Sequence, residues 1–227
     1  ERYCGGLPAG DTPARVTARA SLAREVRLVL EDRVELPRLY MAWHSPAMFA
    51  AGDAEMDLLA DLLANGKTSR LYRTLVYGRR IALDVSAFQN SRELGSFFML
   101  VATAAPGAAL ADIASAIDQE LAAVVEHGPT QAEMERAGAT AESHFMFRLQ
   151  TVGGFGGKSD QLNAYNVFRN DPGFFPRDLA RYQEATAASV REAAARHLRI
   201  DARVTLSVVP RGAAAAALAG SAPVSVS

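Results

Sequence analysis

The sequence predicts an α+β fold, in which a mostly antiparallel sheet of about five or six strands carries helices packed on one face. Short segments that alternate polar and apolar residues occur in neighbouring pairs along the chain. Segments with apolar residues at helical spacing lie between and after these pairs. Neighbouring strands joined by short turns are expected to pair antiparallel, and the grouped helices must bury one face of the sheet.

The first part of the chain predicts two strands and two helices. The strands are expected at 24–30 and at 39–43, as partners of each other. A helix begins at Asp53, and its apolar face is formed by Met56, Leu58, Leu59, Leu62 and Leu63. Asn65-Gly66 is a C-cap of the kind that needs a positive φ angle, and a shorter helix is expected over 69–77.

The rest of the chain predicts a second strand pair, several helices and a last strand. The pair is expected at 81–89 and 95–102, and the last strand at 203–209. One helical stripe is formed by Leu110, Ile113, Ile117, Leu121 and Val124. Two capping boxes, Thr130 to Glu133 and Ser189 to Glu192, predict further helix starts, the first helix running to about Gln150.

Length and composition indicate one domain with a linker at each end. The chain has 227 residues, of which 49% are hydrophobic and 22% charged, as in an ordinary globular protein. Residues 1–21 and 212–227 are rich in small residues and proline without a sustained period, so 22–211 is the expected domain. The net charge of -1 indicates no nucleic-acid partner. No apolar run approaches the roughly 18 residues of a membrane span.

The histidines do not predict a metal site. A zinc site needs three or four ligands, usually with a pair at helical spacing. The four histidines, His44, His127, His144 and His197, are scattered along the chain. Glu126-His127 could end an inverted zinc motif, but Ala123 stands where the first ligand would be. We therefore expect no metal-binding residue.

No nucleotide-binding or nucleophilic motif is complete either. The segment 152–159 nearly matches a phosphate-binding loop, but Val152 stands where that loop needs glycine, and the preceding segment is helical. A glycine hinge between two helices is the simpler interpretation. There is no nucleophile elbow, and Cys4 lies in the expected linker, so no catalytic residue is predicted.

Several segments in order resemble the pitrilysin/insulinase-type zinc metallopeptidases and mitochondrial processing peptidase. The segment 65–75 is similar to their glycine-then-Ser-Arg-Leu-Tyr stretch, and 79–87 to the passage from helix to strand that follows it. The segment 95–107 resembles the next strand with its Pro-Gly exit, and 128–133 resembles the turn before the long helix. Val208-Val209-Pro210 resembles the final strand, so the likeness covers about 23–210.

The resemblance implies the LuxS/processing-peptidase-like fold and a place in a larger zinc peptidase. Members of this family have two halves of two related domains each, which close around a peptide, and zinc is held by a His-x-x-Glu-His motif of a first domain. This chain lacks that motif and resembles the zinc-ligand-free second domain of one half. The matching strand also lacks the arginine and tyrosine of the substrate-gripping half, which favours the zinc-bearing half.

The function that the resemblance implies is a non-catalytic domain that forms part of the peptide-enclosing chamber. Its partners would be the preceding zinc-bearing domain, the other half and the peptide; this segment alone should be inactive. The alternatives are a structural core-type subunit without peptidase activity and an unrelated α+β binding domain. The resemblance does not choose between a periplasmic and a cytoplasmic location. The residues it marks, for the chamber or for structure, are Asn65, Gly66, Lys67, Arg70 and Tyr72.

Two of these marked residues have expected positions. By helical spacing Tyr72 should be partly buried, with its hydroxyl close to a partner. Arg70 should reach a carboxylate of the sheet or of a neighbouring helix. A structural role is the favoured interpretation for both residues.

Overall fold

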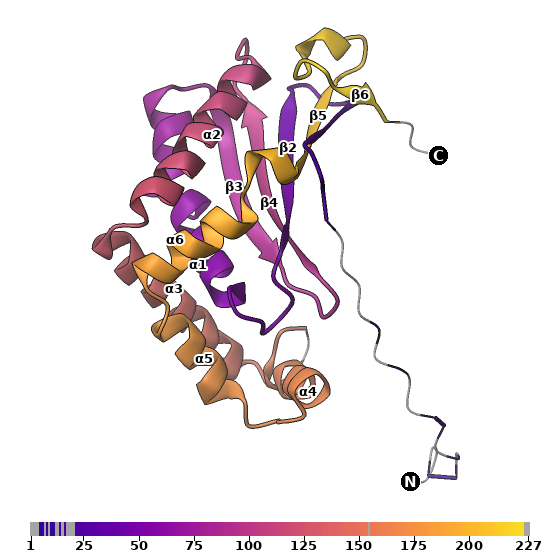
Figure 1. Cartoon of the computed structure of the whole chain (residues 1–227), viewed down its shortest axis with the longest axis vertical. Helices are drawn as coiled ribbons and strands as arrows, with labels where there is room; N and C mark the ends of the chain where they lie inside the picture. The colour runs from indigo at the N-terminus through magenta and orange to yellow at the C-terminus, as the bar shows by residue number, and fades with distance from the viewer. Residues whose placement is uncertain are drawn as a thin grey trace.

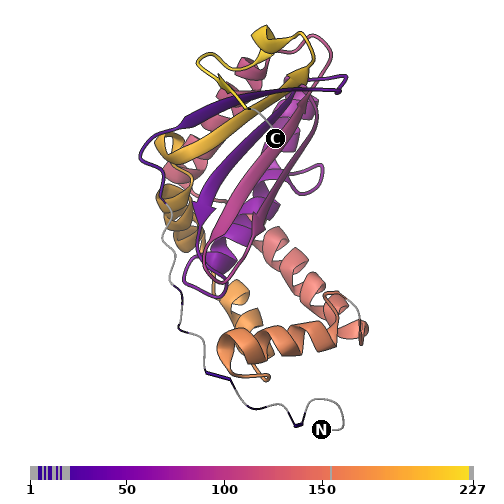
Figure 2. The ribbon, with the colours of Figure 1, turned by 90° about the vertical axis from the view of Figure 1, so that its right-hand side faces the viewer.

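The computed structural model describes residues 5–6, 8, 10–11, 14, 16, 21–153 and 155–224. Within them, a six-stranded sheet carries helices on one face, which confirms the predicted fold class (Figure 1). Figure 2 shows the other face of the sheet without a helix over it. The sheet is mixed, with three antiparallel and two parallel pairings.

The strands follow the spatial order β3-β4-β2-β5-β1-β6. Their bounds are β1 (Val26–Asp32), β2 (Arg38–Ser45), β3 (Ala82–Asn90), β4 (Ser96–Ala104), β5 (Arg203–Pro210) and β6 (Ala222–Pro223). The predicted pairing of β1 with β2 is wrong, because β5 lies between them, parallel to β1 and antiparallel to β2. The reason is burial: five of the eight residues of β5 are buried and none of β1 is, so the last strand takes the interior place.

Three helices pack on the sheet and supply most of the core: α1 (Asp53–Ala64), α2 (Leu110–His127) and α6 (Ala187–His197). A fourth helix, α3 (Gln131–Gln150), packs on α1. The apolar stripes predicted for α1 and α2 are buried, each residue at most 2% exposed. Full burial of one such side chain contributes about 1.5–3 kcal/mol, which explains why these stripes fix the orientation of both helices.

The shorter helix predicted after α1 is present, but it winds more widely than an α-helix. It includes the π-helical segment η1 (Tyr72–Gly78), in which the amide of Arg79 donates to the carbonyl of Thr74, 2.8 Å away. Leu71 and Leu75 remain fully buried against the core. The predicted positive φ is found at Gly66, with a value of 76°.

One of the two predicted capping boxes is confirmed and the other is displaced. Thr130 caps α3, and its own amide donates to Glu133, 2.8 Å away. The box predicted at Ser189 is wrong, because α6 begins at Ala187 and its N-cap is Thr186. Ser189 occupies the third helical position, where its hydroxyl accepts from the amide of Thr186 at 3.0 Å, as a glutamate usually does.

Two further helices, α4 (Lys158–Arg169) and α5 (Phe175–Gln183), lie beyond the end of the sheet (Figure 1). An aromatic cluster joins them to the core: Phe49 packs on Tyr165 and Phe174, with ring centroids 5.9 and 5.5 Å apart. The buried Tyr165 also donates to Asp178, 2.8 Å away. These contacts fix α4 and α5 against the loop that precedes α1.

The segment after Gly212 packs on the sheet over its described residues, where its composition predicts a linker. The expected linker 1–21 lies mostly outside the described residues. After Gly212 the chain forms a short 3-10 turn, η3 (Ala214–Ala216), and β6, which pairs with β1. Leu218 between them is only 7% exposed. Residues 214–224 therefore pack on the sheet.

The cap of α6 can be tested by substitution. Thr186→Ala should lower the free energy of unfolding by about 1 kcal/mol, because the amide of Ser189 loses its acceptor. Thr186→Ser keeps the hydroxyl and should retain most of the stability. Urea denaturation of the three proteins measures the difference. Equal midpoints for the wild type and the alanine variant would show that the cap contributes nothing.

Candidate functional site: a groove along the free edge of β3

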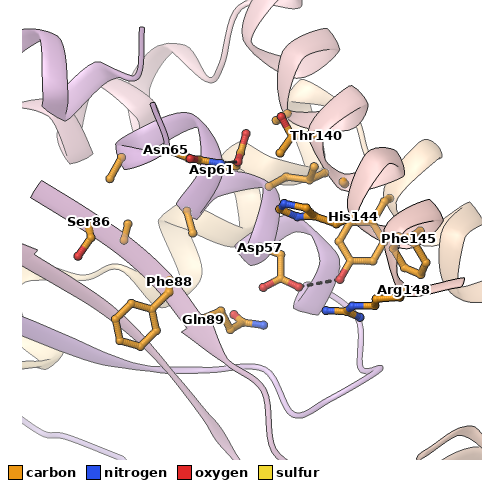
Figure 3. A pocket seen from close by; sticks show the side chains of 17 residues that line it. Asp57, Asp61, Asn65, Ser86, Phe88, Gln89, Thr140, His144, Phe145 and Arg148 are labelled. Atoms are coloured by element: carbon orange, nitrogen blue, oxygen red, sulfur yellow. Dashed lines mark hydrogen bonds between the residues drawn. The ribbon is translucent and has the colours of Figure 1, made fainter. Parts of the chain in front are cut away.

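A groove of about 370 Å³ lies between α1, β3 and α3. Figure 3 shows side chains from the three elements converging on it. Seventeen residues line it, among them Asp57, Asp61 and Asn65 of α1 and its C-cap, Ser86 to Gln89 of β3, and Thr140, His144 and Arg148 of α3. It is the concave surface that the fold places beside an outer strand.

The β3 strand is at the end of the sheet. It pairs antiparallel with β4 on one side, and no other described strand pairs with it on the second side. A strand at the edge of a sheet presents backbone N–H and C=O groups that an additional extended chain can use. Ser86, Ala87, Phe88 and Gln89 bring this edge to the groove. The site therefore combines a concave surface with unpaired strand backbone.

Two carboxylates of α1 lie in the groove, one helical turn apart. Asp57 accepts a hydrogen bond from the hydroxyl of Tyr182, 2.6 Å away. Burial raises the pKa of Asp57 to about 6, although this hydrogen bond favours the charged form. Asp61 is bonded by the side-chain amide of Asn65, and burial raises the pKa of Asp61 as well. Both groups are poised for interaction with a positive charge.

The opposite wall belongs to α3 and combines apolar and basic side chains. Phe145 is buried and packs edge to face on Tyr182, with ring centroids 5.2 Å apart. His144 and Arg148 are exposed on the same helix and point toward the groove (Figure 3). The groove thus has an apolar base with charges of both signs along its rim.

A second cavity of about 440 Å³ continues the groove toward α4. The two share Asp57, Gln89, Phe145, Arg148 and Tyr182 among their lining residues. The continuation reaches Gly156 and Asp160, at the start of α4. One continuous surface therefore runs from the C-terminal end of α1 to the glycine-rich segment after α3.

The five residues marked by the sequence lie in different places. Asn65 lines the groove, whereas Gly66 and Lys67 are exposed in the loop after α1. Arg70 binds both carboxylate oxygens of Glu133 at 2.7 Å and the carbonyl of Gly128 at 3.1 Å. Tyr72 is half-buried beside Tyr77, and its hydroxyl has no hydrogen-bond partner among the described residues. The contact expected of Arg70 is therefore present, and that of the Tyr72 hydroxyl is not found.

Sequence reasoning missed the residues that make most of the groove, chiefly Asp57, Asp61 and Gln89. The signal was present in part, since Asp53, Asp57 and Asp61 repeat every four residues and so share one side of α1. Acidic residues at that spacing usually form a solvated face. Only the packing of α3 and β3 against α1 shows that these carboxylates border a cavity.

The described residues of the glycine-rich segment, 152–153 and 155–159, do not form a phosphate site. It follows α3 and not a strand. The first amides of α4 are already bonded within the segment: Lys158 donates to Thr151 at 2.8 Å and Ser159 to Val152 at 3.1 Å. Those amides are therefore not available to an anion.

No group of three or more histidine, cysteine, aspartate or glutamate side chains in the described part of the chain could hold a metal ion. None of the helices in that part is long and apolar enough to cross a membrane.

The ion pair of Arg70 with Glu133 predicts a dependence of stability on pH. Burial disfavours the charged form of Glu133, yet Arg70 and Thr130 hold the pKa of this carboxyl at about 2. Its contribution should be fully present above the unfolded value of 4.5 and be lost as the pH falls toward 2. We expect about 1–2 kcal/mol at neutral pH, reduced from the full linkage value by solvent screening.

The test compares unfolding of the wild type and Glu133→Gln between pH 7 and pH 2. The stability difference should shrink below about pH 4.5. The matched control is Glu135→Gln, an exposed position on the same helix. A difference that stays constant over this range would contradict the assignment.

The comparisons with known proteins agree with this fold. Residues 1–140 match the family model described as the peptidase M16 inactive domain. A protease from Helicobacter pylori superposes with a TM-score of 0.78 at 20% identity, covering 92% of this chain and 51% of that protein. The peptidase M16 inactive domain from Pseudomonas fluorescens gives 0.71 at 18% identity, over 96% and 49% of the two chains.

A shorter relative matches nearly end to end. The inactive peptidase domain from Bordetella parapertussis has a TM-score of 0.68 at 23% identity, covering 80% of this chain and 96% of that one. No curated protein matches the sequence. The chain spans about half the length of the Helicobacter and Pseudomonas structures. Because the family model covers more than half of its residues, the chain belongs to the M16, pitrilysin-like zinc peptidase family, as an inactive domain.

Proposed function

We propose that this domain forms part of the wall of a peptide-enclosing chamber in a zinc metallopeptidase and holds an extended stretch of the substrate. The observation that supports this most is the groove along the unpaired edge of β3. An extended peptide can add to such an edge as a further strand, so main-chain hydrogen bonds provide affinity and the groove receives side chains. Peptides of many sequences could be held in this way.

The match to the M16 inactive domain supports a division of roles between the domains of the peptidase. The described residues contain no group that fits a zinc ion, so zinc would belong to another domain of the peptidase. The domain described here would limit the space around the substrate and orient it. The preceding zinc-bearing domain and the other half of the peptidase are its proposed partners.

The face of the sheet without helices supports the presence of such partners. It carries Met99, Val101 and Leu206, all half-buried, and Phe88, which is 41% exposed. An open sheet face in water usually carries polar residues, and an apolar one indicates contact with another surface. We propose that this face is turned toward the chamber or toward a neighbouring domain.

Of the residues marked by the sequence, Asn65 and Lys67 would border the chamber. Arg70 and Tyr72 would serve the structure: Arg70 joins the start of η1 to α3 through Glu133, and Tyr72 packs on Tyr77. A purely structural subunit would need these same contacts. It would not need an accessible β3 edge.

Hydrogen exchange can distinguish a domain that holds peptide along β3 from a purely structural subunit. An unstructured peptide long enough to pair with the nine residues of β3 should slow amide exchange in 82–90. Exchange in α6, which packs on α1, α2 and β2, serves as the internal control. We expect protection of β3 alone, because only its edge gains hydrogen bonds. Unchanged exchange in β3 at saturating peptide would favour the structural subunit.

A further inference from the structure

We propose that the groove beside β3 prefers peptides with a basic side chain, which would lie between Asp57, Asp61 and Gln89. This inference rests on the proposed function, because it adds a side-chain preference to the same groove.

The two carboxylates have neutral hydrogen-bond partners only. Asp57 is bonded by the hydroxyl of Tyr182 and Asp61 by the amide of Asn65. Neither forms an ion pair with a described arginine, lysine or histidine, although nine other ion pairs occur in the structure. Partly buried carboxylates without a cation are costly. A ligand that brings a positive charge would form the ion pairs with Asp57 and Asp61 that the domain does not form itself.

Gln89 provides a third acceptor, independent of the carboxylates. Its Nε2 donates to the carboxylate of Asp53 at 2.6 Å and to the hydroxyl of Ser91 at 3.0 Å. Its Oε1 is buried and accepts no hydrogen bond within the described part of the chain. Figure 3 shows Gln89 beside Asp57. A guanidinium or ammonium group has donors only, so it matches a site made of acceptors.

The basic residues of α3 do not neutralise the carboxylates. Burial raises the pKa of Asp57, and the charges of Arg181 and Arg148 oppose this only in part. Burial likewise raises the pKa of Asp61, against the charges of His144 and the half-buried Arg136. None of these four cations forms an ion pair with Asp57 or Asp61, and His144 and Arg148 are exposed on the opposite rim of the groove. The space between the two rims is therefore open to a cation from another chain.

Strand geometry brings a ligand side chain to this point. Side chains of a strand alternate between the two faces of its sheet. Ala87 and Gln89 of β3 point to the helix-covered face, since they lie opposite the buried Leu100 and Phe98. A peptide residue paired beside them would point the same way, toward α1. A long basic side chain at that position would reach Asp57 and Asp61.

The experiment uses three fluorescein-labelled peptides that differ only at one central residue, which is arginine, its neutral analogue citrulline, or glutamate. Their affinity for the chain is measured by fluorescence anisotropy at pH 7.5. We expect the arginine peptide to bind about tenfold more tightly than the citrulline peptide, and the glutamate peptide to bind most weakly. Asp61→Asn should remove most of the difference between arginine and citrulline without changing citrulline affinity.

Two further variants complete the design. Glu192→Gln removes one negative charge from the exposed side of α6, outside the groove, and should leave the preference unchanged. Asp57→Asn should weaken arginine binding as Asp61→Asn does, and thermal unfolding checks that each variant is folded. Equal binding of the three peptides, or a preference that survives both aspartate substitutions, would overturn the inference and leave the proposed function standing. Failure of every peptide to bind would overturn both.

Discussion

The carboxylate of Asp53, only 3% exposed at the first residue of α1, joins the segments that border the groove. It accepts hydrogen bonds from the amide of Phe49 at 2.8 Å, from Gln89 and Ser91 at 2.6 Å each, and from Arg181 at 2.8 Å. These donors come from the loop before α1, the end of β3, the turn after it and α5. A buried charge with four donors is stable only while all of them stay in place, so their relative positions are constrained.

The hydrogen bonds of the Asp53 carboxylate connect it to residues that line both cavities. Arg181 also donates a hydrogen bond to Asp178, and Asp178 accepts another from the hydroxyl of Tyr165. Because Tyr165 belongs to α4, the network extends into that helix. Burial opposes the charge of Arg181, but Asp53 and Asp178 raise its pKa, which keeps it protonated. On the other side Asp53 holds Gln89, which lines the groove and whose Oε1 accepts no hydrogen bond within the described part of the chain. The structural network and the candidate binding surface therefore use the same residues.

Much of the fold was predictable from sequence because it depends on local periodicity. The stripes of α1 and α2, the β3–β4 hairpin and the cap at Thr130 are each specified by neighbouring residues. The place of β5 between β1 and β2 was not predictable, since it is decided by burial among segments far apart in the chain. The groove was not predictable either. Asp57 and Asp61 line a cavity only because Tyr182 and the edge of β3, which are distant in sequence, pack beside them.

A double-mutant cycle on Asp53 and Arg181 tests the central claim, that one buried pair holds the helices beyond the sheet against the core and so shapes the groove. Asp53→Asn, Arg181→Met and the double variant are compared with the wild type by urea denaturation. The account predicts a coupling free energy of about 2–3 kcal/mol, with each single variant strongly destabilised by the charge left unpaired. Additive effects, with a coupling below about 0.5 kcal/mol, would contradict it.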